Sequence, residues 1–142
     1  MTSPTVYGPQ APSGVTFVTA WLSPLAYSAS RHNPGDPLPA TMVDKIGGTG
    51  DLAFSDPLIS VHTLAGATPD LDADTAAYRL SNQVHARMLY LEFDPAVVIT
   101  TADGISAGVD YFDVVEEPVK IPYRDTDVIQ YVSRYRLGFT LA

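Results

Sequence analysis

The clearest hydrophobic pattern in the chain is the alternation at its C-terminal end. Apolar or aromatic side chains occupy nearly every second position from Ile129 to Leu141, and largely polar side chains, including Arg134 and Arg136, occupy the positions between them. A period of two gives a strand one apolar face and one largely polar face, which is typical of an antiparallel sheet. We therefore predict a long strand over residues 129–141.

Two other segments carry apolar residues at helical spacing. The first, residues 14–22, follows Ser13, a residue type that caps helix starts, and is followed by Pro24, which cannot continue a helix. The second predicts a helix over residues 71–92. Its apolar stripe consists of Ala73, Ala77, Leu80, Val84, Met88 and Leu91.

Shorter apolar runs, separated by segments rich in glycine and proline, predict the remaining strands. These strands cover residues 41–46, 58–65 and 109–116, with a short piece within 95–100. The predicted loops cover residues 28–40 and 101–108, and the glycine-rich segment 47–51 is predicted as the turn of a long-looped hairpin. This order of elements predicts an α+β fold: an antiparallel (mixed) sheet of about four strands with two helices packed on one face.

The first twelve residues differ from the rest of the chain. Pro4, Pro9 and Pro12 exclude a helix and disfavour a strand ladder, so we predict an extended N-terminal arm over residues 1–12. Val6 and Tyr7 give that arm apolar groups to bury against a neighbouring subunit, and a disordered tail is the alternative. Residues 13–142 form a single domain in this interpretation, because 142 residues suit one core.

Composition adds two constraints. Hydrophobic residues make up 46% of the chain and charged residues only 17%, and the chain has eight tyrosines and one tryptophan. Because protein interfaces are depleted in charge and enriched in these aromatic residues, this composition predicts that a partner covers part of the surface. The formal net charge is −8, and this negative charge disfavours binding to the phosphate backbone of a nucleic acid. We expect a soluble oligomer without a signal or membrane-spanning segment.

Candidate chemistry is sparse. The chain has no cysteine, and His32, His62 and His85 lack the spacing of metal ligands. The segment 70–74 resembles the start of a calcium loop, but its three aspartates are better explained as helix-capping groups because the required later ligands are missing. The segment 47–51 lacks the lysine of a phosphate-binding loop. We therefore expect no enzyme activity, no catalytic residues, no cofactor and no metal.

Several groups remain as candidate contact residues. Arg134 and Arg136 share one strand face, where they would meet an acidic partner or DNA, or would simply be solvated. We predict contacts between subunits, or with a tube, for the arm and for the hairpin loop over residues 47–57. The predicted contact residues are Val6, Tyr7, Gly47, Gly48, Thr49, Gly50, Asp51, Arg134 and Arg136.

Ordered motifs over residues 14–141 give the chain a resemblance to a known family. They are Ala20-Trp21-Leu22-Ser23-Pro24-Leu25, Leu38-Pro39 with Val43-Asp44-Lys45-Ile46-Gly47-Gly48-Thr49-Gly50-Asp51, Asp56-Pro57-Leu58-Ile59-Ser60-Val61-His62, Val84-His85-Ala86-Arg87-Met88-Leu89, and the final strand from Tyr131 to Leu137. In their order and spacing they resemble the tail terminator proteins of siphovirus-type bacteriophages, especially those of actinobacteria. The group includes the functional counterpart in phage lambda.

The resemblance implies a structural protein of the virion, located at the junction of tail and neck after assembly in the host cytoplasm. Such a protein forms a homohexameric ring that caps the tail tube, stops its polymerisation and joins the tail to the head-completion (stopper) proteins. DNA passes through the ring without specific binding, and no membrane is involved. The alternatives are a head-completion or stopper protein of the neck, and a small cytosolic ligand-binding α+β domain.

Overall fold

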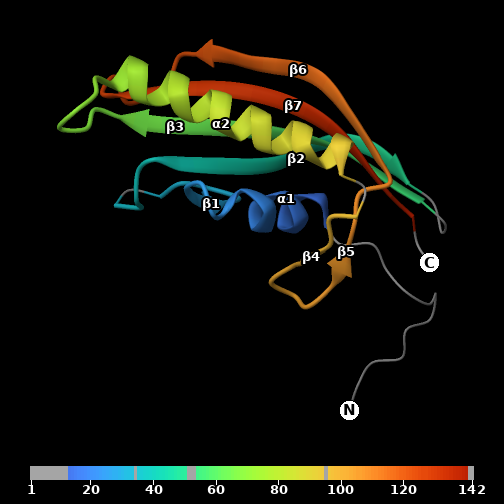
Figure 1. The fold of residues 1–142 in the computed structure, drawn as a ribbon. Helices are drawn as coiled ribbons and strands as arrows, with labels where there is room; N and C mark the ends of the chain where they lie inside the picture. Colours follow the sequence, from blue (N-terminus) through green and yellow to red (C-terminus); the bar gives the residue numbers. More distant parts are fainter. Residues whose placement is uncertain (1–12, 34, 51–53, 95, 141–142) are drawn as a thin grey trace.

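A computed structural model describes residues 13–33, 35–50, 54–94 and 96–140. Its elements in chain order are α1 (Gly14–Leu22), β1 (Tyr27–Ala29), β2 (Ala40–Gly50), β3 (Phe54–Gly66), α2 (Ala73–Phe93), β4 (Ile99–Thr100), β5 (Ser106–Ala107), β6 (Tyr111–Ile121) and β7 (Val128–Thr140). Five strands form a sheet in the order β1-β2-β3-β7-β6, and β4 pairs with β5 (Figure 1). Among the described strands, only the β1–β2 pairing is parallel. The α+β class is therefore confirmed, with one more strand in the main sheet than predicted.

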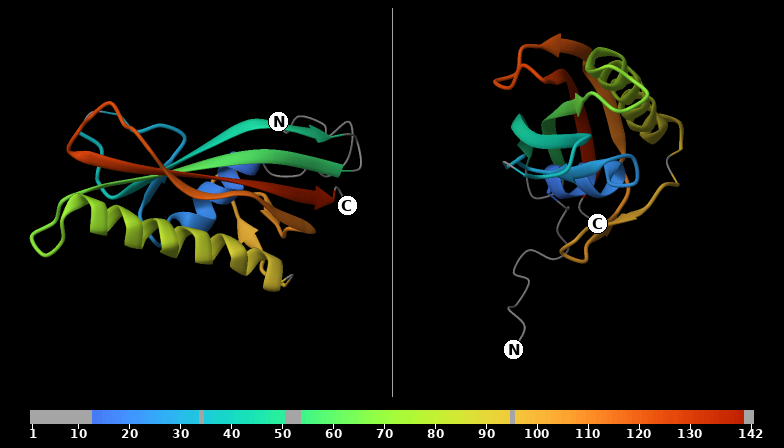
Figure 2. Two further views of the ribbon diagram at one scale, coloured as in Figure 1. Left: turned by 90° about the horizontal axis from the view of Figure 1, so that it is seen from above. Right: turned by 90° about the vertical axis from the view of Figure 1, so that its left-hand side faces the viewer.

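Both helices contribute to one core on the same side of the sheet (Figure 2). Phe17 of α1 packs edge-on against Phe139 of β7, with ring centroids 5.1 Å apart. Val84 and Met88 of α2 are fully buried, as the predicted stripe requires. Burial of these side chains is the main source of stability, because each removes apolar surface from water.

The helix predictions are confirmed. Helix α1 spans the predicted residues, although the Ser13 side chain makes no capping hydrogen bond. Helix α2 begins after Asp72, whose carboxylate accepts a 2.7 Å hydrogen bond from the Thr75 backbone N–H. Hydrogen bonds from the Thr75 side-chain hydroxyl and from its backbone N–H lower the pKa of Asp72 below its usual range, because they favour the ionised form.

Several strand limits are wrong. The predicted turn at 47–51 is wrong for residues 47–50, which continue β2 and pair with β3 up to Gly50 opposite Ser55. The predicted loops 28–40 and 101–108 contain parts of β1 and all of β5. The predicted strand 109–116 ends too early, because β6 continues past Pro118 to Ile121 after two register shifts. An edge strand tolerates this proline, which is not among the paired positions of the β6–β7 ladder.

The two ends of the sheet differ. The β2–β3 hairpin and the end of β7 lie at one end, and the loop after β1 and the turn between β6 and β7 lie at the other (Figure 1). Helices cover one face, which we call the helix face. The face that carries Arg134 and Arg136 we call the open face.

Candidate functional site

The glycine segment forms a distortion in β2 rather than a turn. The register of β2 against β3 shifts between Lys45 and Gly47, which marks a β-bulge. Gly48 has a φ of +119°, and a Cβ placed there would lie 2.7 Å from Cα of Pro57 and clash with the Asp56 carbonyl. A glycine is therefore required at this position, because L side chains rarely adopt such a φ and no room exists for one.

The two predicted arginines lie on the open face, each beside a carboxylate. Arg134 Nη1 is 3.3 Å from Glu116 Oε1 of the neighbouring strand β6. Arg136 Nε is 3.8 Å from Asp56 Oδ1, a distance too long for a hydrogen bond. Both arginine side chains are about two-fifths exposed or more, but the Arg136 Nε and Asp56 Oδ1 atoms are themselves buried and form no hydrogen bond within the described residues. The carboxylates offset much of the positive charge of the two arginines, so this pair of arginines is not favoured as a DNA-binding site.

The structure brings some of the predicted contact residues together. Thr49 lies opposite Asp56 in the β2–β3 ladder, and Asp56 is the carboxylate beside Arg136, so the glycine segment and Arg136 share one region of the sheet. Arg134 lies two residues further along β7. Val6, Tyr7 and Asp51 lie outside the described residues.

The edge strand β6 is a candidate contact surface that the sequence prediction did not identify. It is eleven residues long and pairs only with β7 among the described strands. Four of its large apolar side chains are exposed to between 41% and 48%, namely Tyr111, Val115, Val119 and Ile121. The predicted strand ended at Glu116, so it did not include Val119 and Ile121. An exposed apolar edge strand offers both backbone groups and side chains to another chain.

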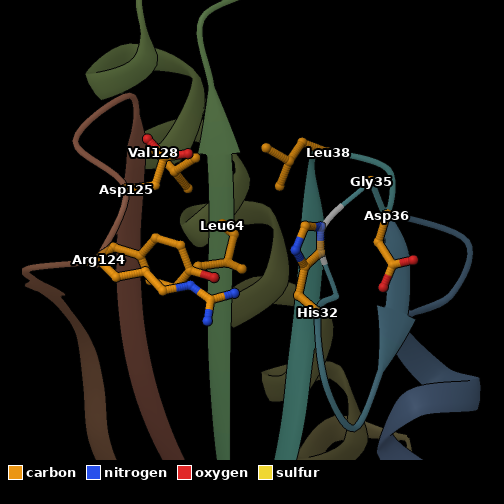
Figure 3. Close-up of a pocket in the computed structure, with 9 residues that line it drawn as sticks. His32, Gly35, Asp36, Leu38, Leu64, Arg124, Asp125 and Val128 are labelled. Carbon is orange, nitrogen blue, oxygen red and sulfur yellow. The ribbon is translucent and has the colours of Figure 1, made fainter.

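A second candidate surface is a groove at the end of the sheet away from the β2–β3 hairpin. One hollow of about 350 Å³ lies between the loop after β1 and the β6–β7 turn, over Leu64 and Val128. A second hollow, of about 430 Å³, shares His32, Tyr123 and Arg124 with the first. We call the two together the end groove. Figure 3 shows the His32 and Arg124 side chains on opposite sides of β3, which carries Leu64.

A third exposed apolar group lies near the end of α2. Tyr90 is 51% exposed, Phe93 79%, and Val98 of the following segment 65%. Tyr90 stacks on Trp21 with ring centroids 6.4 Å apart, and the guanidinium carbon of Arg87 lies 4.0 Å from the centroid of the same tryptophan ring. These contacts join α1 to α2, so part of this group serves the fold.

The ionisable groups of the interior have structural partners. His62 Nδ1 lies 2.7 Å from Gln130 Oε1, and His85 Nδ1 lies 2.7 Å from the Tyr135 hydroxyl. Burial raises the pKa of Tyr135 to about 12. Within the described ranges, no group of three or more His, Asp or Glu side chains is placed to hold a metal ion. No described helix is both long enough and apolar enough to cross a membrane.

The candidate contact surfaces are therefore the open face with its paired arginines, the β6 edge and the end groove. Comparison with protein-family models and with curated proteins finds no match to this chain.

Proposed function

We propose that this chain is a phage tail terminator: a structural protein that assembles into a homohexameric ring, caps the tail tube and joins it to the head-completion (stopper) protein. The observation that carries the proposal is β6, an eleven-residue edge strand with four exposed large apolar side chains. The strand also carries Asp113, Glu116, Glu117, Pro118 and Lys120. Its exposed large apolar side chains nevertheless offer a surface for contact with another chain, and this favours assembly. The ordered sequence motifs supply the kind of assembly.

The two edges of the sheet are different, and this supports a ring rather than a simple dimer. At the other edge β1 covers only Ala40–Met42 of β2, so the Val43–Gly50 part of β2 pairs with β3 alone among the described strands. A contact between two different edges is head-to-tail, and head-to-tail contacts close into rings when the rotation is suitable. The net charge of −8 per copy disfavours adhesion of DNA passing through such a ring.

Tube growth tests the proposal. The tail tube protein encoded in the same genome would be polymerised with and without this protein, and tube lengths measured by electron microscopy. The proposal expects shorter tubes with a ring at one end. Val119→Lys, on the β6 edge, should weaken this capping, because it places a charge in the contact. The matched control is Val98→Lys, at a more exposed valine outside β6.

Two results would contradict the proposal. Tubes that grow to the same length with or without the wild-type protein would exclude a terminator. Binding to the portal side of the neck without any effect on tubes would favour the stopper alternative.

A further inference from the structure

The main sheet has an open edge on each side (Figure 1). On one side the Val43–Gly50 part of β2, which we call the free part of β2, pairs with β3 alone among the described strands, and on the other side β6 pairs with β7 alone. Both edges are accessible, because Asp44, Lys45 and Ile46 are exposed, as are most side chains of β6. The free part of β2 is about 26 Å long at 3.3 Å per residue. Such an edge presents unpaired backbone N–H and C=O groups to another strand.

The strand directions decide how these two edges can meet. Strand β2 is antiparallel to β3, β3 to β7, and β7 to β6, so β2 and β6 run in opposite directions within one copy. Neighbouring copies in a ring of six differ by a rotation of roughly 60°, and a rotation of this size cannot reverse the direction of a strand. Strand β6 of one copy therefore meets β2 of the next copy antiparallel, like the β2–β3, β3–β7 and β7–β6 pairs within a copy.

The charges favour this contact over a contact between two like edges. Glu116 and Lys120 of β6 have ion-pair partners within the chain. The strand also carries Asp113 and Glu117, which are exposed acidic side chains. A twofold contact between two β6 strands would bring the acidic side chains of both copies together, and like charges across paired strands are destabilising. The free part of β2 has no net charge, and its Lys45 offers a cation to the acidic edge.

The apolar side chains of the two edges match as well. Val115 and Val119 of β6 are 47% and 45% exposed, and Ile46 of β2 is 49% exposed. Ile46 lies at the bulge of β2, between the paired positions Lys45 and Gly47. Contact between the edges would bury Ile46 against the valines of β6, which stabilises the assembly by about 25 cal/mol per Å² of apolar surface removed from water.

We propose that the free part of β2 pairs antiparallel with β6 of the neighbouring copy, so that the sheets of all copies join into one closed sheet around the ring. Closure covers both open edges at once, whereas a twofold contact between like edges leaves the other edge open. This inference rests on the proposed ring. It assigns the two strands that join neighbouring copies, their relative direction and the charged contact made by Lys45.

Crosslinking between introduced cysteines tests the direction, because the chain has no cysteine of its own. Full-length single variants would be mixed in pairs, treated with a short bis-maleimide crosslinker and analysed by denaturing electrophoresis. Antiparallel pairing brings Asp44 of one copy close to Ile121 of the next, and Thr49 close to Asp113. The matched pairs are therefore Asp44→Cys with Ile121→Cys, and Thr49→Cys with Asp113→Cys.

The swapped pairs are the control, because they use the same four cysteines: Asp44→Cys with Asp113→Cys, and Thr49→Cys with Ile121→Cys. The matched pairs should give about tenfold more covalent dimer than the swapped pairs, because assembly raises the effective concentration only of cysteines that lie close together. Equal yields would overturn the inference, and higher yields for the swapped pairs would show parallel pairing and overturn it as well. Efficient crosslinking of Val115→Cys to itself would show β6–β6 pairing, which also overturns it.

Lys45→Glu tests the charged contact. The substitution places an acidic side chain against the acidic β6 edge, so rings should dissociate at a several-fold higher protein concentration. Light scattering on serial dilution measures this concentration. Arg79→Glu makes the same change of charge at an exposed residue of α2 and should leave the concentration unchanged. Equal shifts for the two variants would contradict the contact assigned to Lys45.

Light scattering on the wild-type protein separates this inference from the proposed function. Rings of six copies without a preference for the matched cysteine pairs would overturn the strand pairing and leave the terminator proposal standing. Samples that stay monomeric, with and without tail tube protein, would overturn both.

Discussion

The two faces of the sheet differ in what fills them. On the helix face, Phe17, Ile59 and Tyr135 are fully buried and pack into one continuous core with α1 and α2. On the open face, Arg134 and Arg136 face carboxylates across neighbouring strands and remain about half exposed. One face holds the domain together, and the other leaves polar groups and a strand edge available to other chains.

This difference separates stability from function within one sheet. Substitutions on the helix face should lower the free energy of unfolding, because they remove buried apolar contacts or leave buried polar groups unpaired. Substitutions of exposed side chains on the open face and on β6 should leave the fold intact and change assembly. The following predictions test that separation, from the largest effect on stability to the smallest.

Phe17→Ala should have the largest effect. The substitution removes a fully buried ring and its edge-on contact with Phe139, leaving a cavity between α1 and β7. We expect the free energy of unfolding to fall by about 3–5 kcal/mol, measured by urea denaturation followed by circular dichroism. A loss below about 1 kcal/mol would show that α1 is not part of the core.

Tyr135 should make stability depend on alkaline pH. Its pKa is about 12 in the folded protein, against an ordinary value near 10. Between these values only the unfolded chain loses the proton, so stability is fully present below pH 10 and is lost as pH rises to 12. The free energy of unfolding should fall by roughly 2–3 kcal/mol over this interval. Urea denaturation of Tyr135→Phe should show a shallower decline; equal declines would contradict the assignment.

Gly48 and Gly47 offer a matched pair within the bulge of β2. Gly48→Ala should destabilise the protein by about 1–3 kcal/mol, because the positive φ and the nearby β3 backbone both oppose a side chain. Gly47→Ala should be nearly neutral, since the nearest atom to its added Cβ is 3.7 Å away. Thermal unfolding of the two variants measures the difference. Similar melting temperatures for the two variants would contradict the requirement for glycine at position 48.

Arg134→Ala should have the smallest effect on stability. Its ion pair with Glu116 is exposed to solvent, and such pairs contribute about 0–1 kcal/mol. Urea denaturation should therefore show little change. A loss above about 2 kcal/mol would mean that the open face contributes to the fold as the helix face does.

The sequence predicted the helices and β7 because their signals are local and strongly periodic. Helix α1 has the predicted limits, and the α2 stripe is buried except at Ala73, which is half-buried. The alternation along β7 did not predict the burial of its open face near the start of the strand. Val128, Gln130 and Val132 on that face are buried, because the loop after β1 and the β6–β7 turn cover that end of the sheet.

The missed elements depend on contacts distant in sequence. Three residues of β1 have no periodic signal and are fixed only by their parallel pairing with β2. Gly47 to Gly50 look like a turn, yet pairing with β3 keeps them in a strand, and one glycine accommodates the bulge. Predicting the exposed apolar side chains of β6 would have required knowing that the strand continues past Pro118 and that it lies at the edge of the sheet. The end groove likewise joins segments that are distant in the sequence, from His32 to Arg124.

The decisive measurement is the mass of the purified protein in solution, by light scattering over a range of concentrations and with tail tube protein added. The proposed ring should have a mass near six times the chain mass of 15.2 kDa, alone or on tubes, and Val119→Lys should shift the protein toward monomer. A protein that remains monomeric under every condition, tubes included, would contradict it.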